Sequence, residues 1–356
     1  AFRYSLQSTA SLICDLLRSS LPCLVMKKRV SQSPHPYDSL TPDVVIGAVE
    51  SLGFLSDGRI LALNSYENRV YQVGVEDGPP VVAKFYRPGR WTDEAILEEH
   101  EFALELAESE VPVVPPIVRD GRSLFEMSGF RFAVFERRGG RWPELGTQEE
   151  RAWIGRFLGR IHMIGRRVPF RHRGRIDVEA FGEQPRAYLL EEGWLPPHLD
   201  AAYESVTADL LERVRAAFAQ AGASQLRLHG DCHRGNVLWT DAGPHFVDLD
   251  DCAMGPAIQD LWMLLSGSRT EMGEQLSQIL EGYSQFSTFD FNELLLIESL
   301  RTLRMIHYAA WLARRWEDPA FPRAFPWFNE PRYWEEHILQ LREQLAAIDE
   351  GPIELP

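Results

Sequence analysis

The pattern of apolar residues changes once along this chain, at Gly139-Gly140. Before that point, short apolar runs bounded by turn-forming residues predict an antiparallel meander with strands at 60–63, 70–75 and 81–86, and a further strand at 130–135. Thr41, and Thr92 or Asp93, are typical N-caps for two helices in this part, 42–52 and 93–109. After it, apolar residues at helical spacing predict helices at 147–166, 202–221, 257–267, 274–287, 291–316 and 332–348. A strand-rich half followed by a helix-rich half predicts an α+β fold with two lobes.

This division predicts three regions. Residues 1–38 are serine-rich and irregular, and we expect a flexible N-terminal tail there, with an amphipathic targeting helix as the alternative. Met26 is the first methionine, which makes it a candidate for the native start. Residues 39–137 are expected to form an N-lobe of β-sheet plus helix, and residues 138–356 a helical C-lobe.

The charge of the chain limits its partners. Its 37 Lys and Arg residues against 52 Asp and Glu residues give a net charge of −15, which argues against nucleic acid and anionic membranes as partners. No apolar run is long enough to span a membrane. The four cysteines are too few and too scattered for a disulfide framework, so we expect a cytoplasmic protein.

The chemistry is concentrated in residues 228–251, where polar groups stand between apolar flanks. Asp231 is followed five residues later by Asn236, and Asp248 ends an apolar run twelve residues beyond that. These are the parts that phosphoryl transfer from a nucleotide needs. Asp231 can accept the proton of an attacking hydroxyl, while Asn236 and Asp248 supply the hard oxygen ligands that Mg²⁺ prefers.

Two alternatives compete for this stretch. His229 and His233 have the spacing of zinc ligands on a helix, but Gly230 stands where a general-base Glu is expected and Gly235 weakens a helix. A simple polar surface loop is the other alternative. It does not explain why the flanking residues are so apolar.

Lys84 is a charge inside an apolar run, 81–85, which is costly unless the ammonium is paired or faces a cleft. An edge lysine that reaches solvent is the simplest explanation. The acidic helix that follows favours a pair instead, and Glu99 is our choice of partner, with Glu98 as the alternative. Strand lysines of kinases hold the α- and β-phosphates and pair with a helix glutamate in this way.

The motif HGDCHRGN at 229–236, followed by Val247-Asp248, resembles the aminoglycoside and choline kinase-like phosphotransferase superfamily. Four further segments resemble the bacterial stress response kinase A family within it. They are NSYENRVY at 64–71, KFYRP at 84–88, DLDD at 248–251 and GPAIQDLW at 255–262. The proline- and aromatic-rich stretch 318–327 is similar to that family too. The resemblance runs from about residue 39 to the C-terminus.

The resemblance implies a bilobal protein-kinase-like fold and an ATP- and Mg²⁺-dependent serine/threonine protein kinase of the bacterial stress response, cytoplasmic and monomeric. Its substrates would be the Ser and Thr hydroxyls of proteins. Carried over to this chain, Asp231 and Asp248 are the catalytic residues and Asn236 and Asp248 the metal ligands. The implied nucleotide contacts are Ser65, Asn68, Lys84, Glu99, Phe135 and Glu136, the last two at the connector that would face adenine.

Several positions depart from the protein-kinase pattern. Residues 65–68 contain no glycine to cradle phosphates, and Gly230 stands where an arginine precedes the catalytic aspartate. His233 occupies the place of a lysine near the γ-phosphate, and Asp250 is a candidate contact for a second Mg²⁺. We expect Asp260 to brace the backbone around His229.

Two rival functions remain open. A small-molecule kinase acting on a choline-, homoserine- or aminoglycoside-like alcohol would use the same Asp231, Asn236 and Asp248. Residues 180–225 and 311–334 would then determine which acceptor binds. A pseudokinase or scaffold is disfavoured, because all the phosphate-transfer groups are present.

Overall fold

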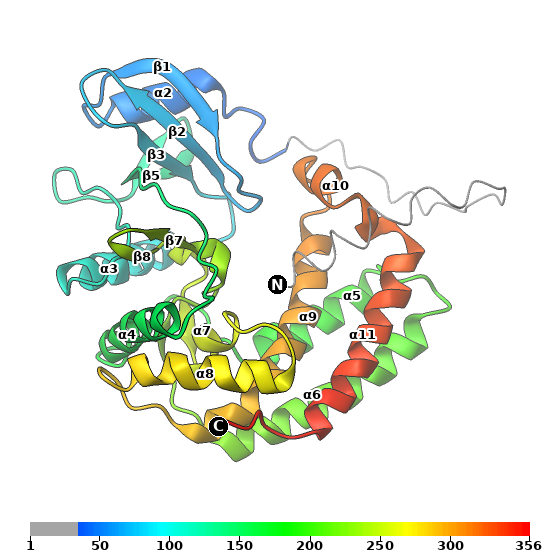
Figure 1. Ribbon diagram of the computed structural model, residues 1–356. Helices are drawn as coiled ribbons and strands as arrows, with labels where there is room; N and C mark the ends of the chain where they lie inside the picture. Colours follow the sequence, from blue (N-terminus) through cyan, green and yellow to red (C-terminus); the bar gives the residue numbers. More distant parts are fainter. Residues whose placement is uncertain (1–34) are drawn as a thin grey trace.

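The computed structural model describes residues 35–356, and its first lobe is a five-stranded antiparallel sheet with two helices (Figure 1). The strands lie in the order β1-β2-β3-β5-β4. Lys84 on β3 pairs with Val70 on β2 and Ala133 on β5, so it lies on the central strand. The elements of this lobe are α2 (Pro42–Glu50), β1 (Ser56–Ala62), β2 (Arg69–Val75), β3 (Val81–Phe85), α3 (Asp93–Glu108), β4 (Phe125–Met127) and β5 (Phe130–Glu136).

The N-lobe begins earlier than the sequence predicted. Tyr37, which we assigned to the tail, is 7% exposed and belongs to the core of the sheet. Its hydroxyl donates to the carbonyl oxygens of Glu67 and Phe85, 3.3 Å away in each case. Residues 35–38 are therefore part of the folded lobe, and the rest of the predicted tail lies outside the described residues.

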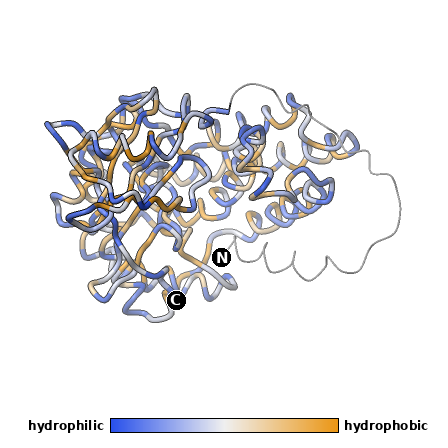
Figure 2. Tube along the Cα trace, turned by 90° about the horizontal axis from the view of Figure 1, so that it is seen from above, coloured by the Kyte–Doolittle hydropathy of each residue, from blue (hydrophilic) through white to orange (hydrophobic). Residues whose placement is uncertain are grey.

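The second lobe is helical, as predicted, and is built on two apolar cores. Figure 2 shows the hydrophobic segments, in orange, on the inner sides of its helices. Helices α4 and α8 touch closely because Gly155 and Gly282 lie at the contact. A Cβ at either position would overlap a carbonyl oxygen of the other helix. The helices are α4 (Gln148–Gly165), α5 (Gln184–Glu191), α6 (Asp200–Ala221), α7 (Ile258–Trp262), α8 (Arg269–Tyr283), α9 (Ile297–Arg314), α10 (Ala320–Ala324) and α11 (Pro331–Asp349).

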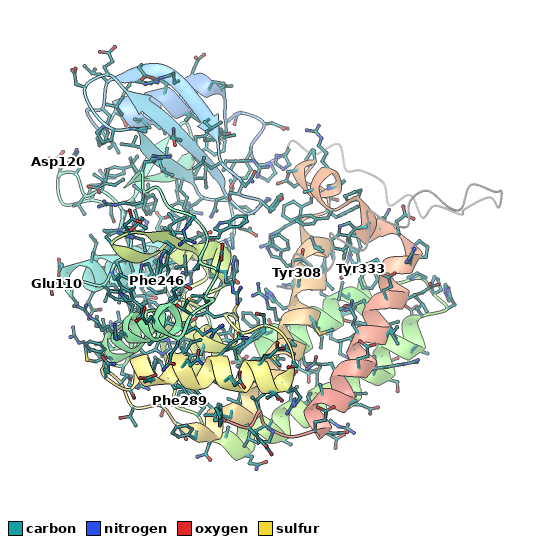
Figure 3. All side chains as sticks on the ribbon, viewed as in Figure 1. Glu110, Asp120, Phe246, Phe289, Tyr308 and Tyr333 are labelled. Atoms are coloured by element: carbon teal, nitrogen blue, oxygen red, sulfur yellow. The ribbon has the colours of Figure 1, made fainter. Side chains whose placement is uncertain are left out.

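Two small strand pairs lie between these helices and the N-lobe. β6 (Leu226–Leu228) pairs with β9 (Ala253–Gly255), and β7 (Val237–Thr240) pairs with β8 (Gly243–Phe246). Phe246, labelled in Figure 3, is fully buried, and its backbone exchanges hydrogen bonds with Pro112 and Val114. The strand pairs therefore join the polar stretch 229–251 to both lobes.

The α+β bilobal prediction is confirmed, and the differences are local. Helix α5 and the preceding π-turn Glu179–Glu183 were not predicted, because Pro185 interrupts the helical spacing. Helix α7 ends at Trp262 and not at 267, while α8 begins at Arg269 and not at 274. Within residues 35–356, none of the helices combines the length and apolarity that a membrane crossing requires.

Candidate active site

The polar stretch begins directly after β6, where the chain turns sharply at Gly230. This residue has φ +82°, and a Cβ there would overlap the carbonyl oxygen of Asp251. Only glycine combines that backbone with so close an approach. Gly230 therefore brings Asp231 against the segment that carries Asp248–Asp251.

Asp260, at the start of α7, holds this turn in place as predicted. Its carboxylate oxygens accept hydrogen bonds from the backbone N–H groups of His229 and Gly230, both at 2.9 Å. The buried ring of His162 lies 3.0 Å from the same carboxylate. Since Asp260 is fully buried, its charge needs these partners, and the turn is fixed by them.

Asp231 projects from the turn with its two oxygens in different surroundings. Oδ1 lies 2.8 Å from Nη1 of Arg304 on α9, while Oδ2 lies 3.4 Å from both Nε2 of His233 and Nδ2 of Asn236. Burial opposes ionisation of Asp231, but Arg304 and His233 outweigh it and hold the pKa of its carboxyl below the usual range. Arg304 lies outside 180–225 and 311–334, the two segments that we expected to determine acceptor choice in a small-molecule kinase.

Asn236 and Asp248 offer oxygen atoms beside this base. The amide nitrogen of Asn236 donates to the carbonyl oxygen of Asp231 at 3.0 Å, and within residues 35–356 its side-chain oxygen accepts no hydrogen bond. The Asp248 carboxylate is 58% exposed and stands on a left-handed backbone, φ +62°. Strain of this kind collects at functional sites. Two hard oxygen donors with unused capacity fit a Mg²⁺ site.

Lys84 lies opposite, on β3, and is 6% exposed. Its ammonium is 3.1 Å from Oε1 of Glu99, which confirms the predicted ion pair. It also lies 2.9 Å from Asp250 and 3.5 Å from Asp248. Burial alone would neutralise Lys84, but Asp250 and Glu99 overcome it and raise the pKa of the ammonium.

Glu98, the alternative partner, has a different task. Its carboxylate accepts backbone hydrogen bonds from Arg171, His172 and Arg173, at 2.6–3.0 Å. Glu98 therefore ties α3 to a loop of the C-lobe. The phase of α3 turns the two neighbouring glutamates to these different partners.

Two arginines that the sequence analysis missed surround Asp250. Arg90 forms ion pairs with Asp250 and Asp251, and buried Arg173 donates to the carbonyl oxygens of Asp250 and Cys252. Asp250, the candidate contact for a second Mg²⁺, is 4% exposed, and its carboxylate is already paired with Lys84 and Arg90. The sequence signal that could have identified Arg90 is its position shortly after the KFYRP segment at 84–88.

The other predicted nucleotide contacts are spread along the N-lobe. Ser65 is half-buried in the loop between β1 and β2. Asn68 is 3% exposed, and its side-chain oxygen accepts a hydrogen bond from the backbone of Arg87, which favours a bracing role over a nucleotide contact. Phe135 and Glu136 end β5 at the connector to the C-lobe, as the prediction requires.

The loop between β1 and β2 is fastened to the C-lobe by Glu67, another residue missed from the sequence. Its Oε2 accepts from the indole of Trp311 at 2.7 Å and pairs with Arg315 at 2.5 Å. The ring of Tyr66 packs at a tilt against that of Phe325, with centroids 4.9 Å apart. In Figure 1, α9 and α10 rise on the right toward the N-lobe. The loop is thereby held in place without glycine.

Asp318, which follows α9, forms a second set of contacts between the two lobes. Its carboxylate is 2% exposed and lies 2.6 Å from Arg87, 3.1 Å from Arg69 and 2.9 Å from Nε2 of His35. Burial opposes its ionisation, but the Ala320 amide and the two arginines lower the pKa of Asp318. Within residues 35–356, the cations that this carboxylate neutralises all come from the N-lobe.

We expect Asp318→Asn to lower the free energy of unfolding by about 3 kcal/mol, because it removes the buried counter-charge of Arg69 and leaves Arg87 with Glu67 alone. Since the pKa of Asp318 is lower in the folded state, its contribution is present above the unfolded pKa of about 3.9 and is lost as the pH falls through the folded one. Equilibrium urea denaturation measures the change.

The matched control is Asp349→Asn, which removes an exposed pair with Arg213 and should cost less than about 1 kcal/mol. Equal losses for the two variants would contradict a fastening role for Asp318.

The zinc alternative is not supported. The chain between His229 and His233 is not helical, and a 3-10 turn at Arg234–Asn236 follows. His229 Nε2 lies 3.0 Å from the carbonyl oxygen of Val247, and His233 Nδ1 accepts from the backbone of Gly235. Both rings therefore hold the loop itself.

The chain is similar to known kinases in sequence. Residues 59–297 match the phosphotransferase enzyme family. The chain is 45% identical over 326 residues to stress response kinase A of Escherichia coli O157:H7, covering 92% of this chain and 99% of that protein. It is 44% identical, with the same coverage, to "Serine/threonine protein kinase RdoA" of Salmonella typhimurium.

Solved structures share the fold at lower identity. One is an amicoumacin kinase in complex with AMP-PNP, Ca²⁺ and Ami, with a TM-score of 0.68 at 20% identity, covering 88% of this chain and 95% of that one. Another is a choline kinase from Cryptosporidium parvum, with a TM-score of 0.58 at 12% identity, covering 87% and 97%.

Proposed function

Because this chain belongs to the phosphotransferase enzyme family and, within it, to the stress response kinases A, we propose that it is an ATP- and Mg²⁺-dependent kinase of protein serine and threonine hydroxyls. That it is a phosphotransferase follows from the family. The nucleotide, the metal, the residue roles and the protein acceptor are the proposed part.

The observation that carries the proposal is the convergence of Asp231, Asn236, Asp248 and Lys84 from both lobes. The four residues form two pairs within hydrogen-bond or ion-pair distance: Asn236 reaches Asp231, and Lys84 reaches Asp248. A base, two oxygen donors and a buried ammonium are the groups that transfer of a γ-phosphoryl group requires.

Each residue has one task in this proposal. Lys84 binds the α- and β-phosphates, and Glu99 keeps its ammonium oriented. Asp231 accepts the proton of the acceptor hydroxyl. Asn236 and Asp248 would hold Mg²⁺, which supplies charge stabilisation to the phosphates. The backbone beyond Glu136 hydrogen-bonds the adenine edge, and Ser65 contacts the nucleotide from the β1–β2 loop.

The test incubates the full chain with γ-labelled ATP and Mg²⁺, and offers a protein acceptor and a panel of metabolite alcohols in parallel. We expect label on serine or threonine of the protein. Label in a metabolite alone would move the assignment to a small-molecule kinase. Magnesium-dependent nucleotide binding with no transfer to any acceptor would contradict the proposal.

A further inference from the structure

One face of α9 runs past the catalytic loop, and Figure 3 labels Tyr308 on this helix. The contacts of α9 define the face. Arg301 covers the ring of Trp262, Arg304 touches Asp231, and Trp311 reaches Glu67 in the β1–β2 loop. The half-buried residues along it and at its C-cap are cationic or aromatic, with no carboxylate among them: Arg301, Arg304, His307, Tyr308, Trp311 and, at the cap, Arg315.

The arginines on this face differ in their partners. Arg301 pairs with Glu298 at 3.2 Å, and Arg315 pairs with Glu67 at 2.5 Å. Neither of these carboxylates has a proposed part in the reaction. In the described part of the chain, the only carboxylate that pairs with Arg304 is that of Asp231, the proposed base. Arg304 is also 42% exposed, so an incoming group can reach it.

Arg304 and the proposed metal ligand Asn236 approach different oxygens of Asp231. The guanidinium contacts Oδ1, whereas Asn236 and His233 lie next to Oδ2. The guanidinium also lies 3.9 Å from the sulfur of Met263, which follows α7. A group that approaches Oδ1 of Asp231 therefore meets this guanidinium.

A guanidinium bound to Oδ1 of the base opposes catalysis, because it occupies an oxygen that an acceptor hydroxyl would contact, while Oδ2 already lies next to His233 and Asn236. Asp231 can act as the base when another anion pairs with Arg304 in its place. The surroundings favour such an anion. Burial, together with Arg304, Arg315 and Arg314, lowers the pKa of His307 to about 3, so this ring stays neutral in a cationic environment.

We propose that Arg304 selects acceptors that carry a carboxylate close to the reacting hydroxyl, and that binding of this carboxylate releases Asp231. The inference rests on the proposed function and adds a substrate class to it: acidic segments of proteins. It disfavours cationic alcohols such as choline, which would meet Arg304 at the base with like charge.

The experiment uses the full chain with ATP and Mg²⁺ and five acceptors. Three are serine peptides that differ only in their flanking residues: aspartate, asparagine or lysine. The other two are glycerate and choline. We expect kcat/KM to be on the order of tenfold higher for the aspartate peptide than for the asparagine peptide, as for a hydrogen bond between charged groups. The lysine peptide should be poorer still.

Three variants identify the residue. Arg304→Gln should abolish the preference for the aspartate peptide, mainly by raising its KM, and Arg304→Lys should restore part of it. Arg301→Gln, the same change one turn away, should keep the preference. Hydrolysis of ATP in the absence of acceptor should rise in Arg304→Gln, because the base is released. A fall in that hydrolysis would assign Arg304 to the phosphoryl group and overturn the inference.

The remaining outcomes separate the two proposals. Transfer to peptides without a preference for aspartate, or a preference that survives Arg304→Gln, overturns the inference and leaves the kinase assignment in place. Transfer to glycerate but to no peptide supports the anionic acceptor and contradicts the protein substrate. Absence of transfer to every acceptor overturns the proposed function, and the inference falls with it.

Discussion

Asp231→Asn should lower kcat for transfer from ATP to an acceptor hydroxyl by roughly 10³-fold, the scale of losing a positioned general base. Asparagine keeps the shape of the side chain but cannot take a proton. The hydrogen bonds of Asp260 to the turn do not involve the Asp231 side chain, so the loop should keep its conformation. KM for ATP should change little, since Asp231 faces Asn236 and α9 and not Lys84.

Initial rates with labelled ATP measure this effect, and Asp241→Asn is the control. Asp241 is an exposed aspartate in the turn of the β7–β8 hairpin, ten residues along the chain from Asp231. Its variant should retain the wild-type rate. If Asp231→Asn kept more than about a tenth of the wild-type kcat, Asp231 would not be the base.

Asp248→Asn should reduce kcat/KM by on the order of 10³-fold, because it removes a charged ligand from the proposed Mg²⁺ site. The choice of asparagine matters. Asp248 has a left-handed backbone, φ +62°, which asparagine tolerates far better than alanine does. The substitution therefore tests the charge separately from the backbone conformation. The Mg²⁺ concentration that gives half-maximal activity should rise as well.

Asp120→Asn is the matched control for this variant. Asp120 also has a left-handed backbone, φ +50°, and is exposed in a turn of the N-lobe, at the left edge of Figure 3. The same chemical change there should leave the magnesium dependence as it is. Similar magnesium titrations for the wild type and Asp248→Asn would remove Asp248 from the metal site.

The core of the candidate site was predictable because its groups are close in the sequence. Asp231, Asn236 and Asp248 are within 18 residues, so local chain geometry alone brings them near one another. The Lys84–Glu99 pair was predictable for a different reason. A charge on an apolar strand needs a partner, and the next helix is rich in acids.

The interlobe contacts were not predictable, because they join residues far apart in the chain. Glu67 and Trp311 are 244 positions apart, and Arg69 and Asp318 are 249 apart. Nothing local to any of these residues indicates its partner. Arg304 was missed for the same reason, since its approach to Asp231 depends on how α9 packs in the C-lobe.

Some differences in the fold had signals that could have been used. Ser268 and Glu271 form a capping box at the start of α8, and the S-x-x-E spacing is visible in the sequence. That signal places the helix start five residues before the predicted one. Tyr37, by contrast, packs on the sheet through tertiary contacts that its turn-rich neighbours do not indicate.

The most direct test of the account is a crystal structure of the protein with Mg²⁺ and a nonhydrolysable ATP analogue. We predict that the side-chain oxygens of Asn236 and Asp248 lie about 2.1 Å from the ion, that Lys84 contacts the α- and β-phosphates, and that Asp231 faces the γ-phosphoryl group across the space for a hydroxyl. An ion held by other residues, with Asn236 and Asp248 turned away from it, would contradict the account.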